Sequence, residues 1–206
     1  MRRIALLGFT LAALLGAGLA ARAADIEVRE VSVRPVEDGL VLDADFEFEL
    51  GPRLADVVAN GVPLYFRVEF ELSRRRWYWL DEKTASRELQ LRLSYHALSR
   101  QYRLSSGLLQ QHFPTLEEAL RVLRHVRNWL VVERTVGFVD ADYDAAVRMR
   151  LDTSLLPRPF QLSALTSREL TLESPWKRFI LRSPRQLPAP VESREPLPRE
   201  PKGADK

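Results

Sequence analysis

The sequence GVPLYFRVEFELSRRRWYWLDE, residues 61–82, sets the architecture, because its first half alternates strictly between apolar and polar side chains. Side chains point alternately to the two faces of a strand, so the pattern predicts a long strand over residues 64–73 with one buried and one solvated face. The apolar side chains that share the buried face are Leu64, Phe66, Val68, Phe70 and Leu72.

The same segment ends in the densest cluster of cationic and aromatic residues in the chain. This cluster consists of Arg74, Arg75, Arg76, Trp77, Tyr78 and Trp79. Guanidinium and indole groups together bind sugar rings, lipid headgroups or a protein hot spot. We predict that these six residues form a recognition surface. The alternative is that Trp77 and Trp79 continue the apolar face of the strand and cap the core.

Outside this segment the chain consists mainly of short alternating segments separated by turn residues. They predict strands over residues 26–33, 40–50, 89–95, 102–104, 145–152, 160–164, 170–173 and 176–181, with a loop over residues 105–114. Residues 129–136 are rich in β-branched side chains, which favours a strand there over an extension of the preceding helix.

Two helices are expected. A short one over residues 53–59 follows Pro52 and ends at the left-handed stop Asn60-Gly61. A longer one starts at Thr115, which forms a capping box with Glu118. Its apolar stripe consists of Leu116, Ala119, Leu120, Leu123 and Val126.

These elements predict a mainly β (β-rich α+β) domain. We expect an antiparallel β-sandwich of about eight strands with one amphipathic α-helix and a short helix. A partly open barrel that holds a ligand is the alternative.

The N-terminal 23 residues have the three-part form of a secretory signal peptide. Arg2 and Arg3 precede an uncharged apolar run over residues 4–19, and Ala21-Arg22-Ala23 is a small-x-small cleavage site. A cut after Ala23 predicts a periplasmic protein with no membrane span after cleavage. The alternative is an inner-membrane anchor through residues 4–19, although that run is shorter than a spanning helix requires.

Export changes how the charge is interpreted. The chain has 31 basic residues, of which three lie in the leader, so 28 basic residues remain against 28 acidic ones. A protein that binds nucleic acid needs a basic footprint, which a net charge of zero does not provide. Residues 24–182 then form a single domain without cysteine, and the Pro-rich residues 183–206 are expected to be a disordered tail.

No pattern of residues indicates catalysis, a metal or a cofactor. His96, His112 and His125 lack a second ligand at metal-site spacing. The acidic run from Asp140 to Asp144 lacks the glycine and glutamate that a calcium loop requires at its sixth and twelfth positions. Ser174 and Lys177 match S-x-x-K without its partner motifs, which favours a chance match. Carboxylates on solvated strand faces, such as those of Glu47, Glu49, Glu69 and Glu71, are expected to form cross-strand ion pairs. We therefore predict a protein that is not an enzyme.

Three stretches resemble one bacterial family, domain of unknown function 4390 (DUF4390). They are residues 61–82, the segment LDTSLLPRPFQLSAL over residues 151–165, and the segment around Trp176. The resemblance covers about residues 26–181 and implies an exported proline-rich signal-peptide protein with no known catalytic residues or cofactor. It also implies a link to a membrane sensor kinase. The prolines of the second stretch, Pro157 and Pro159, are expected to fix the exit of the chain from a strand.

Two functions follow as expectations. The first is a non-enzymatic module that binds an envelope protein. The sensor region of a membrane kinase is one example of such a partner. The second is a carrier of a small apolar ligand or lipid, held between the sheets. The sequence carries no information on the oligomeric state.

Overall fold

A computed structural model describes residues 26–74, 82–134, 141–161 and 170–182, and it confirms the predicted fold class. Within these ranges, nine strands form two antiparallel sheets. Sheet A has the order β1-β2-β7, with β1 (Glu27–Val36), β2 (Gly39–Glu47) and β7 (His125–Glu133). Sheet B has the order β6-β5-β4-β3-β8-β9, with β6 (Leu109–Phe113), β5 (Gln101–Ser106), β4 (Glu82–His96), β3 (Leu64–Arg74), β8 (Tyr143–Leu151) and β9 (Lys177–Leu181).

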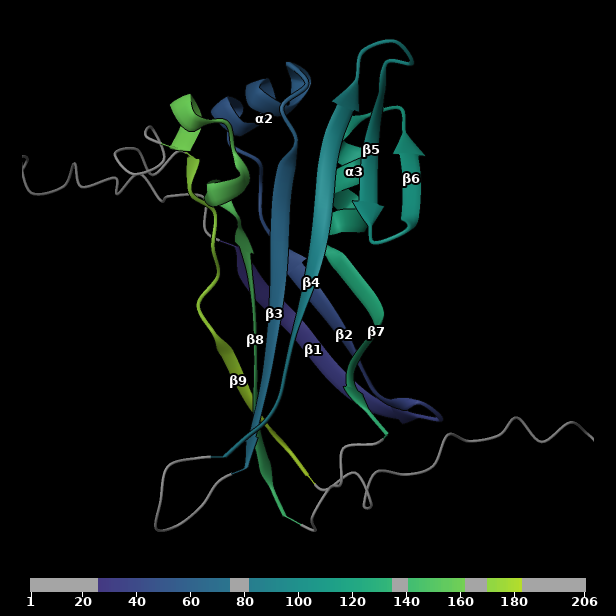
Figure 1. Cartoon of the computed structure of the whole chain (residues 1–206), viewed down its shortest axis with the longest axis vertical. Helices are drawn as coiled ribbons and strands as arrows, with labels where there is room; N and C mark the ends of the chain where they lie inside the picture. The colour runs from purple at the N-terminus through teal and green to yellow at the C-terminus, as the bar shows by residue number, and fades with distance from the viewer. Residues whose placement is uncertain (1–25, 75–81, 135–140, 162–169, 183–206) are drawn as a thin grey trace, which may run out of the picture.

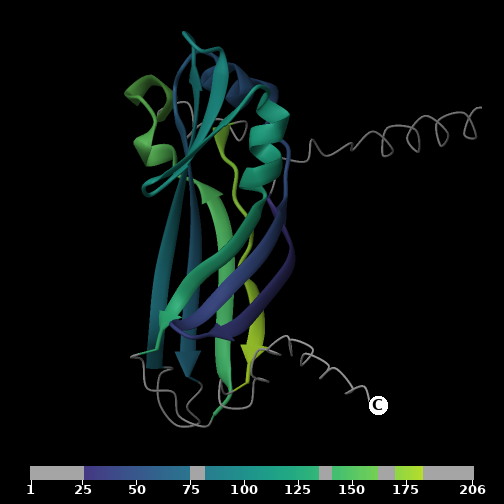
Figure 2. The ribbon, with the colours of Figure 1, turned by 90° about the vertical axis from the view of Figure 1, so that its right-hand side faces the viewer.

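The described part of the molecule is elongated, and β3, β4 and β8 run along its long axis (Figure 1). The helices α2 (Pro52–Ala59) and α3 (Leu116–Leu123) lie at the upper end of that view, together with the β4–β5 turn. The turned view in Figure 2 shows α3 directly above the strands of sheet A. The last residues of β3 and β9 therefore lie at the end opposite the helices.

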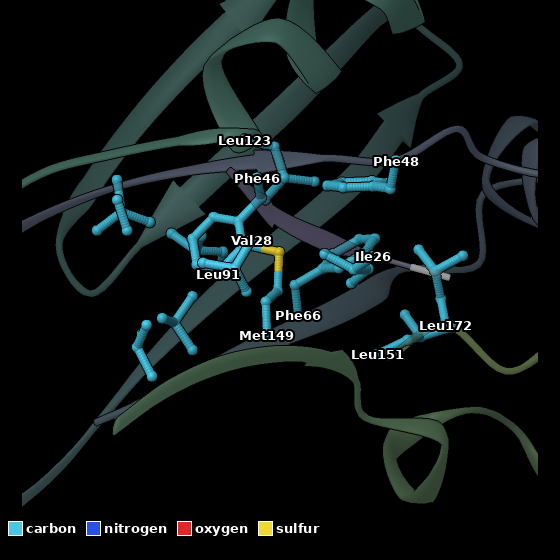
Figure 3. Packing of buried hydrophobic residues seen from close by; sticks show 14 of the residues in the cluster. Ile26, Val28, Phe46, Phe48, Phe66, Leu91, Leu123, Met149, Leu151 and Leu172 are labelled. Carbon is cyan, nitrogen blue, oxygen red and sulfur yellow. The ribbon is translucent and has the colours of Figure 1, made fainter. Parts of the chain in front are cut away.

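The core lies between the inner faces of the two sheets and is closed at the upper end by α3 (Figure 3). All five apolar side chains that the sequence assigns to the buried face of β3 are 0% exposed. Phe66 of β3 stacks on Phe48, which follows β2, with 5.6 Å between the ring centroids. Leu123 of α3 and Met149 of β8 reach the same cluster. One continuous apolar cluster thus joins both sheets.

The long helix ends earlier than the sequence predicts. The α3 cap is confirmed, because the Glu118 N–H donates to Thr115 Oγ1 at 3.3 Å. The helix stops at Leu123, however, and β7 begins at His125. Val126, predicted to belong to the helical stripe, instead pairs with Ala44 of β2. A buried apolar side chain at this position fits the helical period and the strand period equally well. The pairing with β2 favours the strand.

Three short segments also differ from the prediction. Leu109–Phe113, expected to be a loop, forms the edge strand β6, whose side chains are exposed or half-buried and therefore do not alternate. Residues 158–161 form a helical turn, which includes the first two residues of the strand expected over residues 160–164. Residues 170–173 do not form a regular strand, and only Glu173 makes an isolated bridge, to Arg150.

Candidate functional site

The predicted recognition surface begins at the last residue of β3. Arg74 is paired in register with Glu82 of β4 and with Tyr143 of β8. Arg75, Arg76, Trp77, Tyr78 and Trp79 lie outside the described residues. The described surface that leads to them is the outer face of sheet B, formed by the polar side chains of β3, β4 and β8 that point away from the core.

An ion-pair network covers the middle of this outer face. Glu69 of β3 is only 7% exposed, and its carboxylate accepts hydrogen bonds from Arg148 and Arg150 of β8. The bond from Arg150 Nε to Glu69 Oε1 is 2.9 Å long. The sequence predicted such cross-strand pairs, and Glu69 confirms the prediction. A charge held by two guanidinium groups from a neighbouring strand also fixes those groups in place.

The surroundings of Glu69 keep it ionised. Burial disfavours the charged carboxylate and acts to raise its pKa. The hydrogen bonds and charges of Arg148 and Arg150 act in the opposite direction and outweigh burial, so the pKa of Glu69 lies below its ordinary value. Glu69 therefore remains negatively charged at neutral pH and in mildly acidic solution.

This pKa shift predicts a specific acid sensitivity. A carboxyl group with a lowered pKa in the folded state stabilises the protein above its ordinary value of 4.5, and this contribution is lost as the pH falls through the folded pKa. In the Glu69→Gln variant, we expect the free energy of unfolding to fall less steeply in acid, by up to about 1.4 kcal/mol per pH unit. Urea unfolding from about pH 6 to pH 3 measures the slope.

Asp45 and Asp152, whose pKa values are also lowered, are present in both proteins and cancel in the comparison. Equal slopes for the wild type and for Glu69→Gln would show that Glu69 does not bind its proton differently in the two states.

A turn motif borders the upper part of the outer face. Asp152, directly after β8, is 3% exposed, and its Oδ1 accepts hydrogen bonds from the N–H (3.2 Å) and the hydroxyl (2.5 Å) of Ser154. The guanidinium of Arg67 binds its other oxygen. Gln161 Nε2 donates at 2.7 Å to the carbonyls of Ser154 and Leu156. Asp152, Ser154 and Gln161 belong to the segment over residues 151–165 that resembles the family. Their hydrogen bonds hold this turn together, which gives the three residues a structural role.

Removing the Asp152 carboxylate is expected to destabilise the protein. In Asp152→Ala, the Ser154 N–H and the partly buried Arg67 lose their acceptor, which costs about 2 kcal/mol. Thermal unfolding should show a decrease in Tm of about 4–8 °C for a domain of this size. Asp152→Asn keeps an acceptor for Ser154 and should lose less, so two equally destabilised variants would contradict this assignment.

Trp176, which directly precedes β9, places an aromatic side chain on the outer face. The Arg148 guanidinium lies over its indole ring, 4.5 Å from the centroid, while Glu69 holds the same guanidinium from the other strand. Two surface hollows border the indole. The lining of one, of about 240 Å³, includes Glu71, Ser73, Asp144, Ala146, Trp176 and Arg178. The other, of about 360 Å³, is lined by Arg148, Glu173, Ser174, Pro175 and Trp176.

Other residues considered from the sequence have structural partners. The Ser174 hydroxyl accepts a hydrogen bond from the Met149 N–H at 3.0 Å and is 5% exposed, which explains this serine without catalysis. His125 Nδ1 lies 2.7 Å from Asp45 on the outer face of sheet A, and His96 Nδ1 lies 3.0 Å from the Ser99 hydroxyl. Within the described ranges, no three His, Asp or Glu side chains are grouped so that they could hold a metal ion.

These features define a class of protein: a β-rich α+β domain of two antiparallel sheets. On the outer polar face of sheet B, an ion pair between Glu69 and Arg148 holds the guanidinium over the ring of Trp176. The chain belongs to the family described as domain of unknown function (DUF4390), whose model matches residues 23–180. No curated protein and no solved structure matches it. Among the helices of the described residues, none has the length and apolar character needed to cross a membrane.

Proposed function

We propose that this protein is an exported periplasmic domain without enzymatic activity, which binds a protein partner of the cell envelope through the outer face of sheet B around Trp176. The observation that carries the proposal is the Trp176–Arg148–Glu69 arrangement. Tryptophan and arginine are the residues most enriched at the centres of protein interfaces.

The arrangement is held in place before any partner binds. Trp176 is half-buried and packs under Arg148, which Glu69 holds through a hydrogen bond. A side chain that is already ordered loses little conformational entropy when a partner covers it, and this entropy costs about 0.5–1.5 kcal/mol for each mobile side chain at an interface. The geometry therefore favours recognition by this face.

Trp176 also lies near the end of β3, where the predicted recognition surface begins. β3 contributes Glu71 and Ser73 to the hollow beside Trp176 and ends at Arg74, the first of the six predicted residues. The carrier function has less support, because a continuous cluster of buried side chains packs the inner faces of the two sheets against each other.

The proposal is tested by cross-linking and affinity purification of the tagged full-length protein from intact envelopes. Wild type is compared with Trp176→Ala and with Trp129→Ala, a matched control that removes a half-buried tryptophan from sheet A. Circular dichroism first confirms that both variants are folded. The sensor region of a membrane kinase is the first partner to probe.

We expect one reproducible partner with the wild type and with Trp129→Ala, and its loss with Trp176→Ala. Partner lists that are the same for all three proteins, or the recovery of no reproducible partner, would overturn the proposal.

A further inference from the structure

We infer that the hollow between Trp176 and Asp144 binds a lysine or arginine side chain of the partner. This inference rests on the proposed function and adds the chemistry that the surface recognises. The hollow, of about 240 Å³, opens on the outer face of sheet B beside the last residues of β3, which lie at the end opposite the helices (Figure 1).

Strand register explains why a hollow forms at this point. Ala146 of β8 is paired with Glu71 of β3 on one side and with Arg178 of β9 on the other. The methyl group of Ala146 is much smaller than its two neighbours, so space remains above it. Asp144 and Ser73, paired with each other, lie two residues along the same strands and line the hollow as well.

The charges around the hollow favour a cation. Among the described residues, its lining has two carboxylates, Glu71 and Asp144, and one guanidinium, that of Arg178. Asp144 is half-buried, and among the side chains that the structure describes none donates a hydrogen bond to its carboxylate. By contrast, the more deeply buried Glu69 and Asp152 both bind arginine. A partly desolvated carboxylate without a donor gains most from a charge-assisted hydrogen bond.

The indole of Trp176 favours the same occupant. The guanidinium of Arg148 already lies over this ring, with its Cζ atom 4.5 Å from the ring centroid. The ring also borders the hollow, so an ammonium or guanidinium group placed there would contact the indole and Asp144 together. Arg178 is exposed, so water and salt screen its repulsion of the incoming cation.

The test is an NMR titration of the leaderless chain with short peptides. The probes are acetyl-Ala-Arg-Ala-amide and acetyl-Ala-Lys-Ala-amide, and the control is the peptide with norleucine at the central position, which has similar length but no charge. The signals followed are the Trp176 indole N–H and the Ala146 methyl group. We expect saturable shifts with the two basic peptides only.

Three variants locate the binding. Asp144→Asn should weaken binding of both basic peptides about tenfold, because it removes one charge-assisted hydrogen bond. Ala146→Leu should abolish binding by filling the hollow. Gln90→Leu, an exposed position on β4 of the same outer face, should bind as the wild type does. Equal shifts with norleucine, or unchanged binding by Asp144→Asn, would overturn the inference.

The envelope experiment separates this inference from the proposed function. If Trp176→Ala loses the partner and Asp144→Asn keeps it with undiminished recovery, the surface binds a protein but not through a basic side chain. If the basic peptides bind to the hollow and the wild type recovers no partner, the chemistry assigned to the hollow is correct and the proposed protein-binding function is wrong.

Discussion

The Phe66→Ala variant is expected to lose about 3–5 kcal/mol of unfolding free energy, the largest effect that we predict for a single substitution. Phe66 is 0% exposed and lies on β3, between β4 and β8. Its ring stacks on Phe48, on the sheet A side of the core. Truncation therefore removes buried apolar area and also leaves a cavity at the contact between the two sheets.

Urea unfolding at neutral pH measures this loss. The matched control is Phe179→Ala, which removes the same atoms from a half-buried site on the edge strand β9. The control should lose less than half as much, because water already reaches that site. Equal losses would mean that the contact between the sheets contributes no more to stability than the edge of sheet B does.

The Gly39→Ala variant is expected to lose about 3 kcal/mol, through two separate effects. Gly39 lies at the β1–β2 hairpin with φ of +148°, a backbone conformation that residues with a side chain rarely adopt. A methyl group at this position would lie 2.0 Å from the carbonyl oxygen of Val132 in β7. Since that oxygen belongs to the backbone of a paired strand, it cannot move away without breaking the pairing.

Gly61→Ala separates the two effects. Gly61 has φ of +85°, but no atom outside its own chain neighbours lies within 4 Å of the added methyl group, so this variant has only the conformational cost of about 1 kcal/mol. Both variants are compared by chemical denaturation. If Gly39→Ala is no less stable than Gly61→Ala, the close approach of β7 to the hairpin is not present in solution.

Most of the strands could be predicted from the sequence, whereas the exposed edge strand β6 could not. β3 and β8 alternate between apolar and polar residues because one face packs into the core. β6 has no buried face, so its sequence carries no such period. The end of α3 was missed because Val126 fits the helical spacing, and only its pairing with Ala44 shows that it belongs to a strand.

The candidate site was predictable only in part, for a related reason. The ion pairing of Glu69 follows from the type of residue and its strand face, but the identity of its partners depends on the register of β3 against β8. The hollow beside Trp176 combines residues from three strands, and Glu71, Asp144 and Arg178 are far apart in the sequence. The signal peptide, the C-terminal tail and the recognition surface predicted at residues 74–79 stay predictions.

The pairing of β2 with β7 has a consequence for how the chain folds. Asp45 and His125, which contact each other across these strands, are 80 residues apart in the sequence. Contacts of this kind require a large loop to close before any stabilisation is gained, and proteins dominated by them fold in milliseconds to seconds. Until β7 has been synthesised, one edge of β2 has no partner strand and is open to association with other chains. We therefore expect refolding in a stopped-flow experiment to be slow, and its yield to fall as the protein concentration is raised.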